Sequence, residues 1–277
     1  MAVRVRCITD PACVWSWAVE PAVRALIVEF GDELRWTFVM GGLAREFQDD
    51  RLVRHWLDAS AESGMPTDPR SWYEGPLSSS YPACMALKAA QEQGPEPAAR
   101  YLRALREGIV AMRRKLDTRE VLVEEARGAG LDVERFRIDL GSHAIVEAFG
   151  ADLEEARDVP QVVRDAEKVR CSEAVGEERV PFPTFRFEGD GGVYWTCGFR
   201  PGAALRDAAI TAGARPGEAP RPEVMGALER FGRMAVPEVA AVCDLPQLAA
   251  EAELARLALD WRVRPVPVGA GRLWETA

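Results

Sequence analysis

Cys13 and Ser16 lie three residues apart in the segment TDPACVWSW, residues 9–17. A cysteine that loses its proton is a nucleophile, and a second cysteine at the later position would close a disulfide with it. Position 16 is instead a serine, whose hydroxyl can donate a hydrogen bond to sulfur but cannot form a disulfide. The pair therefore predicts monothiol chemistry, in which an external thiol must release any mixed disulfide formed at Cys13.

Cys13 stands where a helix is expected to begin. Apolar residues recur every three or four positions over residues 15–30, and Gly31 ends the pattern. The free N–H groups and the positive dipole end of a helix N-terminus stabilise a thiolate, so we expect a Cys13 pKa between about 3.5 and 7.5. The alternative is a small buried cysteine in a scaffold without redox activity. Asp10 is expected either to act as a general base for water near the thiolate or to cap the turn into the helix.

The elements around this segment follow an α/β pattern. Residues 3–8 alternate between apolar and polar, and a second strand is predicted at 34–40, after the helix. Helical periodicity then extends over about residues 43–178. Strand pattern returns at 180–197 around a glycine-rich turn, and a helix is predicted at 201–213. The order is β, α, β, a helical block, then β, β, α.

Four segments in this order resemble the DsbA-like branch of the thioredoxin fold, in particular bacterial FrnE-type proteins. DPACVWSW is similar to their active-site segment D-P-x-C-x-W-C-W/Y, and VMGGL and SSYPACMALKAAQEQG are similar to later segments. VPFPTF, residues 180–185, occupies the place of the family's cis-proline, which would be Pro183. The resemblance covers about residues 3–213 and implies a thioredoxin-like fold with a large helical insertion.

The resemblance implies a thiol–disulfide oxidoreductase, of monothiol (C-x-x-S) type because of Ser16. Cys13, Ser16 and Pro183 are then the predicted catalytic residues. A cis peptide before Pro183 would present the backbone of Phe182 to an extended substrate, whereas a trans proline on an edge strand is the alternative. The predicted substrate-binding residues are Trp15, Trp17, Phe182 and Asp10.

Two other functions fit the same scaffold. Adaptors that deliver a regulator to a protease have been built on it, and for them the groove matters more than the sulfur. Glutathione transferases or isomerases of the kappa class share the core with a helical insertion and use an active-site serine, a role that Ser16 would fill. No tightly bound cofactor is expected, while glutathione or another small thiol is an expected co-substrate.

Composition excludes several classes of protein. The 277 residues are 48% hydrophobic and 29% charged, as in ordinary globular proteins. No apolar run is long enough to cross a membrane and no signal-peptide pattern opens the chain, so we expect a cytoplasmic protein. The six cysteines lack a disulfide-framework spacing, and neither histidine lies near a cysteine, so no metal site is predicted. Strand patterns contain Cys7 and Cys197, and helical patterns contain Cys84, Cys171 and Cys243.

Residues 214–277 are predicted to form a separate unit from the domain at 1–213. A Pro- and Gly-rich linker precedes three helical segments and a hairpin, an order that resembles a winged helix-turn-helix. This unit has eight arginines, no lysine and nine acidic residues, a formal balance of 8 − 9 = −1, and the whole chain has a charge of −9. Nucleic-acid binding is therefore not expected, although Arg262, Arg264 and Arg272 leave a wing contact as an alternative. We expect a packing or homodimerisation module.

Overall fold

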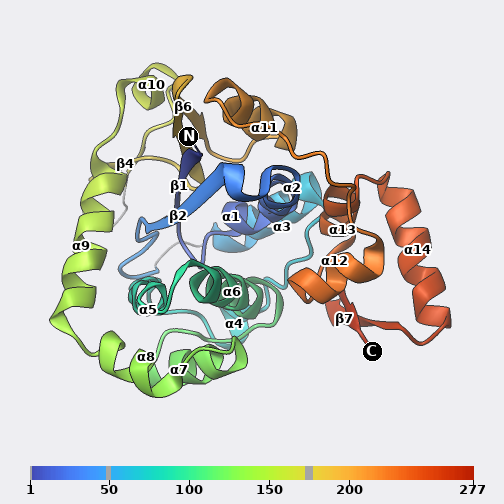
Figure 1. Ribbon diagram of the computed structural model, residues 1–277. Helices are drawn as coiled ribbons and strands as arrows, with labels where there is room; N and C mark the ends of the chain where they lie inside the picture. The colour runs from blue at the N-terminus through green and yellow to red at the C-terminus, as the bar shows by residue number, and fades with distance from the viewer. Residues whose placement is uncertain (1, 48–50, 172–176) are drawn as a thin grey trace.

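A four-stranded sheet forms the centre of the computed structural model, which describes residues 2–47, 51–171 and 177–277 (Figure 1). The strand order is β2-β1-β5-β6; β2 is parallel to β1, β5 is antiparallel to β1, and β6 is antiparallel to β5. This arrangement confirms the predicted α/β, thioredoxin-like fold. The strands of this sheet are β1 Val3–Thr9, β2 Leu34–Met40, β5 Thr184–Gly189 and β6 Gly192–Cys197.

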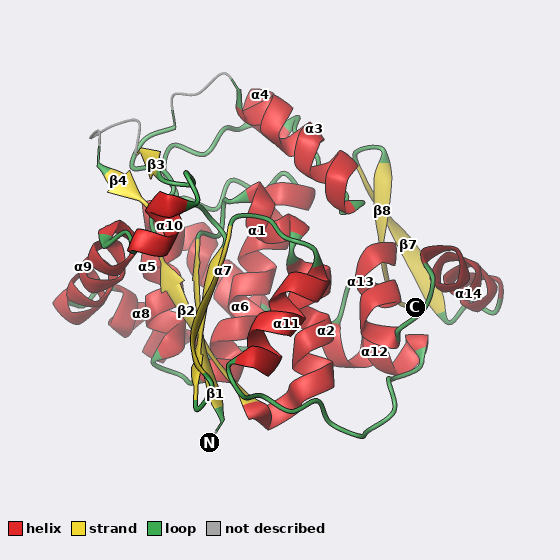
Figure 2. Cartoon of the chain, turned by 90° about the horizontal axis from the view of Figure 1, so that it is seen from above, coloured by secondary structure: helices red, strands yellow, loops and turns green. Residues whose placement is uncertain are grey.

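The alternation in β1 decides which face each side chain takes. Val3, Val5 and Cys7 are buried in a core shared with α2 Glu20–Phe30 and α11 Gly202–Thr211. Arg6, on the other face, pairs with Glu155. Helices therefore cover both faces of the sheet, α2 and α11 on one and α5 Tyr81–Gln91 and α9 His143–Arg157 on the other (Figure 2).

The first predicted helix is two helices in the structure, α1 Val14–Ala18 and α2. Pro21 lies in the first turn of α2 and has no N–H to donate to the carbonyl of Trp17, so a continuous helix would lose that bond. A short 3₁₀ turn, η1 Gly31–Glu33, then leads into β2. Cys13 consequently precedes a helix of only five residues.

The helical insertion agrees with the prediction over most of its length. Cys171 is an exception, because Arg170 and Cys171 pair with Arg179 and Glu178 as two short strands. Within the described residues the elements of this region are α3 Leu52–Ser63, α4 Ser71–Glu74, α5 Tyr81–Gln91, α6 Pro95–Arg106, the π-helical turn η2 Glu107–Ala111, α7 Arg119–Gly128, α8 Val133–Leu140, α9 His143–Arg157, α10 Gln161–Asp165, β3 Arg170–Cys171 and β4 Glu178–Arg179.

The C-terminal unit has the predicted three helices and hairpin. Its helices share an apolar core, but α13 packs against α2, and Leu273 and Val268 join the core that contains Trp17. This unit is therefore fastened to the rest of the chain, and its division at residue 213, its winged-helix likeness and its role in dimerisation stay predictions. Its elements are α12 Val224–Phe231, α13 Val236–Cys243, α14 Gln247–Leu259, β7 Val263–Val268 and β8 Gly271–Thr276.

In the described part of the chain, no helix combines the length and the apolar character needed to cross a membrane.

Candidate functional site

Cys13 is the N-cap residue of α1 and lines a cleft of about 750 Å³. Its side chain is 5% exposed, and its Sγ donates a hydrogen bond to the carbonyl oxygen of Phe182 at 3.7 Å. The peptide bond between Phe182 and Pro183 is cis. The structure thus brings together Cys13, Phe182 and Pro183, which are far apart in the sequence.

The pKa of the Cys13 thiol is raised, so the predicted low pKa is wrong. Burial is the largest cause, and the negative charge of Asp10 adds to it. Hydrogen bonds from the hydroxyl and N–H of Ser16 and the charge of Arg179 act in the opposite direction. Because α1 is short and the sulfur is almost inaccessible to water, burial raises the pKa of Cys13 more than the helix N-terminus lowers it. A protonated thiol at neutral pH is a weak nucleophile.

Ser16 is completely buried behind Cys13, at one end of a chain of hydrogen bonds. Its hydroxyl accepts from Oγ1 of Thr9 at 2.8 Å, and that oxygen accepts from Nη2 of Arg106 at 2.6 Å. A guanidinium only donates, so the hydrogen of Thr9 goes to Ser16, and the hydrogen of Ser16 is left for the sulfur. This relay favours the thiolate and offsets part of the effect of burial.

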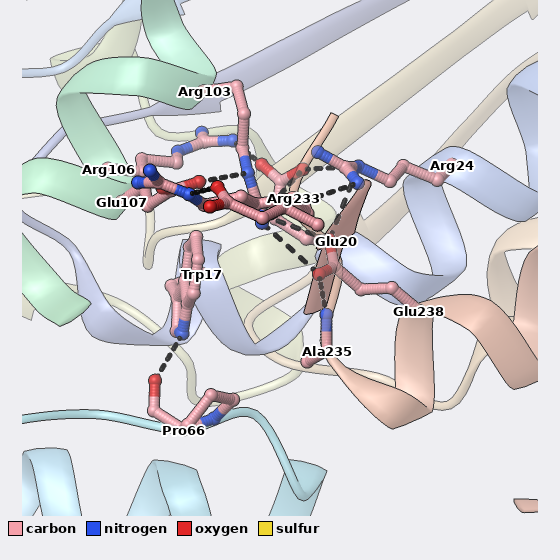
Figure 3. Close-up of polar contacts among 11 residues, drawn as sticks. Trp17, Glu20, Arg24, Pro66, Arg103, Arg106, Glu107, Arg233, Ala235 and Glu238 are labelled. Atoms are coloured by element: carbon pink, nitrogen blue, oxygen red, sulfur yellow. Dashed lines mark hydrogen bonds and ion pairs between the residues drawn. The ribbon is translucent and has the colours of Figure 1, made fainter. Parts of the chain in front are cut away.

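Arg106 belongs to a group of buried, paired charges that we call the buried charge cluster: Glu20, Arg24, Arg103, Arg106 and Glu238 (Figure 3). Nη1 of Arg103 lies 2.9 Å from Glu238, and Nε of Arg24 lies 3.2 Å from the same carboxylate. Glu20 pairs with Arg106 and is 3.7 Å from Arg24. The cluster joins α2, α6 and α13, so it links the thioredoxin core, the insertion and the C-terminal unit.

Asp10 lies inside the protein and is not among the described residues that line the cleft. It is completely buried, and its Oδ1 accepts from the N–H of Ala12 at 2.8 Å. Its Oδ2 accepts from the N–H of Leu43 at 2.6 Å and from the hydroxyl of Ser80 at 2.8 Å. The prediction that Asp10 contacts substrate is therefore wrong. Asp10 instead stabilises the turn before Cys13 and connects it to the insertion.

The two tryptophans predicted to bind substrate take different places. Trp15 is partly exposed and lines the cleft, with its ring centroid 5.6 Å from that of Phe199. Trp17 is completely buried, its Nε1 donates to the carbonyl of Pro66 at 3.0 Å, and Arg103 lies 4.2 Å from its ring centroid (Figure 3). The prediction for Trp17 is wrong, because that face of α1 points into the core.

Arg179 is a functional candidate that the sequence did not indicate. Its side chain is 8% exposed, lines the cleft and lies over the ring of Phe182 at 4.2 Å. Its charge acts on both Cys13 and Asp10. Neither Arg179 nor Arg106 stands in the motifs around Cys13 or Pro183, and only tertiary packing brings them to the site.

The other described cysteines are weaker candidates for a functional thiol than Cys13. All five cysteines whose side chains are described are buried and free. Burial raises the pKa of Cys7 to about 12 and that of Cys243 to about 11. The described residues contain no group of three or more His, Cys, Asp or Glu side chains placed to hold a metal ion. Of these cysteines only Cys13 lines the cleft.

A family model described as "Thioredoxin" matches residues 7–162, more than half of the chain. Curated relatives named "ClpXP adapter protein SpxH" are 33% identical over 161 residues in Halalkalibacterium halodurans and 30% identical over 156 residues in Bacillus subtilis. These matches cover 54% of this chain, and 53% and 52% of the two relatives. The chain thus spans about half the length of the curated relatives it matches.

Solved structures are similar at lower identity. A putative protein disulfide isomerase from Nitrosomonas europaea has a TM-score of 0.62 at 20% identity, and the match covers 76% of this chain and 97% of the isomerase chain. The probable DsbA oxidoreductase SCO1869 from Streptomyces coelicolor has a TM-score of 0.56 at 21% identity, with 78% and 93% covered. The cytosolic disulfide reductase DsbM from Pseudomonas aeruginosa has a TM-score of 0.52 at 20% identity, with 75% and 93% covered. These likenesses establish the fold.

Proposed function

Because this chain belongs to the thioredoxin family and has a DsbA-like fold, we propose that it is a binding protein of the adapter kind, which holds an extended segment of a partner protein in the cleft beside Cys13. The observation that carries the proposal is the state of the sulfur. Cys13 is buried, its pKa is raised and its thiol donates to Phe182, while Ser16 stands where a second thiol would release a mixed disulfide.

The cleft itself supports binding. It is lined by aromatic side chains, among them Phe182, whose backbone before the cis-proline would pair with an extended segment. Several curated relatives are named adapters of ClpXP, which makes a Clp-type unfoldase or its substrate the first partner to test. A cytoplasmic location follows from the same proposal.

Site-specific photo-crosslinking tests this function. A benzoylphenylalanine at Phe47, in the cleft, should crosslink to one defined partner in cells, and Cys13→Ala should leave the yield unchanged. The same probe at Trp261, which is 86% exposed on the C-terminal unit, is the matched control. Crosslinks that require Cys13 and disappear with reductant would show that the partner is held by a disulfide.

The second candidate is monothiol thiol–disulfide exchange, and the hydrogen-bond relay onto the sulfur of Cys13 favours it. In that case oxidised glutathione should leave a stable adduct on Cys13, detectable by mass spectrometry and absent in Cys13→Ala. The serine-based transferase has less support. Ser16 is completely buried and is not among the described residues that line the cleft.

A further inference from the structure

One wall of the cleft has three basic side chains, Lys168, Arg170 and Arg179, which we call the basic wall. Within the described chain none of them forms an ion pair with a carboxylate. Each donates instead to a backbone carbonyl, namely that of Cys197 at 3.1 Å, of Val169 at 3.3 Å and of Val180 at 3.0 Å, respectively.

Arginines just outside the cleft differ from the basic wall. Arg157 pairs with Glu177 at 2.6 Å, and Arg164 pairs with Glu178 at 2.6 Å. The chain as a whole has a charge of −9, so acidic partners are plentiful. Lys168, Arg170 and Arg179 face the cleft and nevertheless have no carboxylate partner among the described residues.

The positive charges of the basic wall repel one another. Burial lowers the pKa of Lys168, and the charges of Arg200 and Arg170 lower it further. Burial also lowers the pKa of Arg179; Cys13 and Asp10 oppose this effect, and the charges of Arg157 and Arg170 add to it. Cations that disfavour one another at close range are stabilised when an anion enters between them.

Arg179 is the buried member of the basic wall and is held in place by its contacts. It is 8% exposed, and its Nε is buried without a hydrogen-bond partner among the described residues. Its guanidinium lies on the ring of Phe182, whose carbonyl accepts a hydrogen bond from the sulfur of Cys13. A carboxylate that enters the cleft there meets a guanidinium that has no carboxylate partner among the described residues, and guanidinium groups bind carboxylates through two parallel hydrogen bonds.

Elsewhere in the cleft three carboxylates stand against one arginine, Arg51. Glu46, Asp58 and Glu62, on α3 and the segment before it, also line it. A bound acidic group is therefore repelled from that part and attracted toward the basic wall.

We propose that the ligand of the cleft is an acidic segment of a partner protein, whose carboxylates bind Lys168, Arg170 and Arg179. This inference rests on the proposed function, since it assumes that the cleft holds a protein segment, and it specifies the chemistry of that segment. Acidic side chains next to the segment that lies along Phe182 are the feature by which the partner is recognised.

The first experiment uses Cys13 as a reporter of the local charge. Iodoacetate carries a carboxylate and iodoacetamide does not, yet both react with the same thiolate, so the ratio of their rates does not depend on the pKa of Cys13. We expect this ratio to be about threefold or more above that of N-acetylcysteine amide, and to fall as salt screens the wall.

Two variants with equal changes in net charge sharpen this test. Lys168→Gln with Arg170→Gln should lower the ratio toward that of the model thiol, with Arg179 accounting for what remains. Arg127→Gln with Arg215→Gln, both exposed and away from the cleft, should leave it unchanged. A wild-type ratio at or below that of the model thiol, or an equal loss in both variants, would overturn the proposal.

The second experiment identifies the ligand class. A short glutamate-rich peptide should protect Cys13 from iodoacetamide at a concentration about tenfold below that of its glutamine counterpart. Equal protection by inorganic phosphate would show a site for small anions and contradict the acidic segment. If both experiments give the expected results while crosslinking from Phe47 finds no partner, the basic wall binds acidic groups but the adapter function is wrong. If crosslinking finds a partner while both experiments fail, only the role of the basic wall is wrong.

Discussion

Two groups of charged side chains lie on either side of Cys13, and they differ in how they are paired. Behind it, the buried charge cluster places each arginine against a carboxylate, as Arg103 against Glu238 at 2.9 Å shows. In front of it, the basic wall has no carboxylate partner among the described residues. The difference separates charges that hold the structure together from charges that are available to a ligand.

The comparison also explains the state of the sulfur. From behind, Arg106 acts on Cys13 only through Thr9 and Ser16, and from the front Arg179 acts through space. Both favour the thiolate, but burial is the larger effect. Cys13 therefore remains a thiol until a ligand or a change of surroundings alters that balance.

The largest expected effect comes from breaking the buried cluster at Glu238. This carboxylate is completely buried and pairs with Arg24 and Arg103, so Glu238→Ala removes the nearest carboxylate from two buried guanidinium groups, which retain only longer contacts with Glu20 and Glu107. We expect a loss of about 3–5 kcal/mol in the free energy of unfolding. Urea denaturation followed by circular dichroism measures it.

The control is Glu253→Ala, which removes an exposed partner of Arg256 and should change stability little. Glu238→Gln, which retains the shape of the side chain and one acceptor oxygen, should cost less than Glu238→Ala. Equal, small losses in the Glu238 and Glu253 variants would show that the cluster does not fasten the C-terminal unit.

A second, smaller effect concerns pH. The pKa of Glu20 is lowered: burial opposes this shift, but the charges of Arg106, Arg103 and Arg24 outweigh it. A lowered pKa in the folded state adds stability that is fully present above the unfolded value of about 4.3 and is lost as pH falls through the folded pKa. The stability difference between the wild type and Glu20→Gln should therefore be greatest near neutral pH and shrink in acid. A difference that grows on acidification would contradict the sign of this linkage.

The relay behind Cys13 gives a further test. Thr9→Val retains the shape of the buried side chain but removes the hydroxyl between Arg106 and Ser16. Losing a hydrogen bond worth about 1 kcal/mol should slow alkylation of Cys13 near neutral pH by about fivefold. Thr9→Ser should restore the rate, and Thr67→Val, at another buried threonine, should not change it. A slow rate in both Thr9 variants would point to packing instead of the relay.

Local patterns were enough to predict the sheet, the insertion and the position of Cys13. The alternation of residues 3–8 and the glycine-rich turn between β5 and β6 are properties of neighbouring residues, and the structure confirms them. The periodicity around Trp15 and Trp17 marks a helix, but the choice of which ring meets the cleft depends on α6 and the segment around Pro66.

The electrostatics of the site could not be predicted in this way. The expected low pKa of Cys13 assumed a long helix and an open sulfur, and the break before Pro21 and the surrounding core provide neither. Arg106 follows an amphipathic pattern that is typical of a solvated face, yet α2 and α13 cover it. The linker at 214–222 suggested a detached unit, and its composition carries no information on the ion pairs of Glu238.

The most direct test of the account is the rate at which iodoacetamide modifies Cys13 in the native protein as a function of pH, followed by mass spectrometry of the peptide that contains it. We predict an inflection above the ordinary cysteine value of about 8.5, as expected of a buried thiol in a binding cleft. An inflection below about 7.5 would show a stabilised thiolate. That result would contradict the adapter proposal and favour thiol–disulfide exchange.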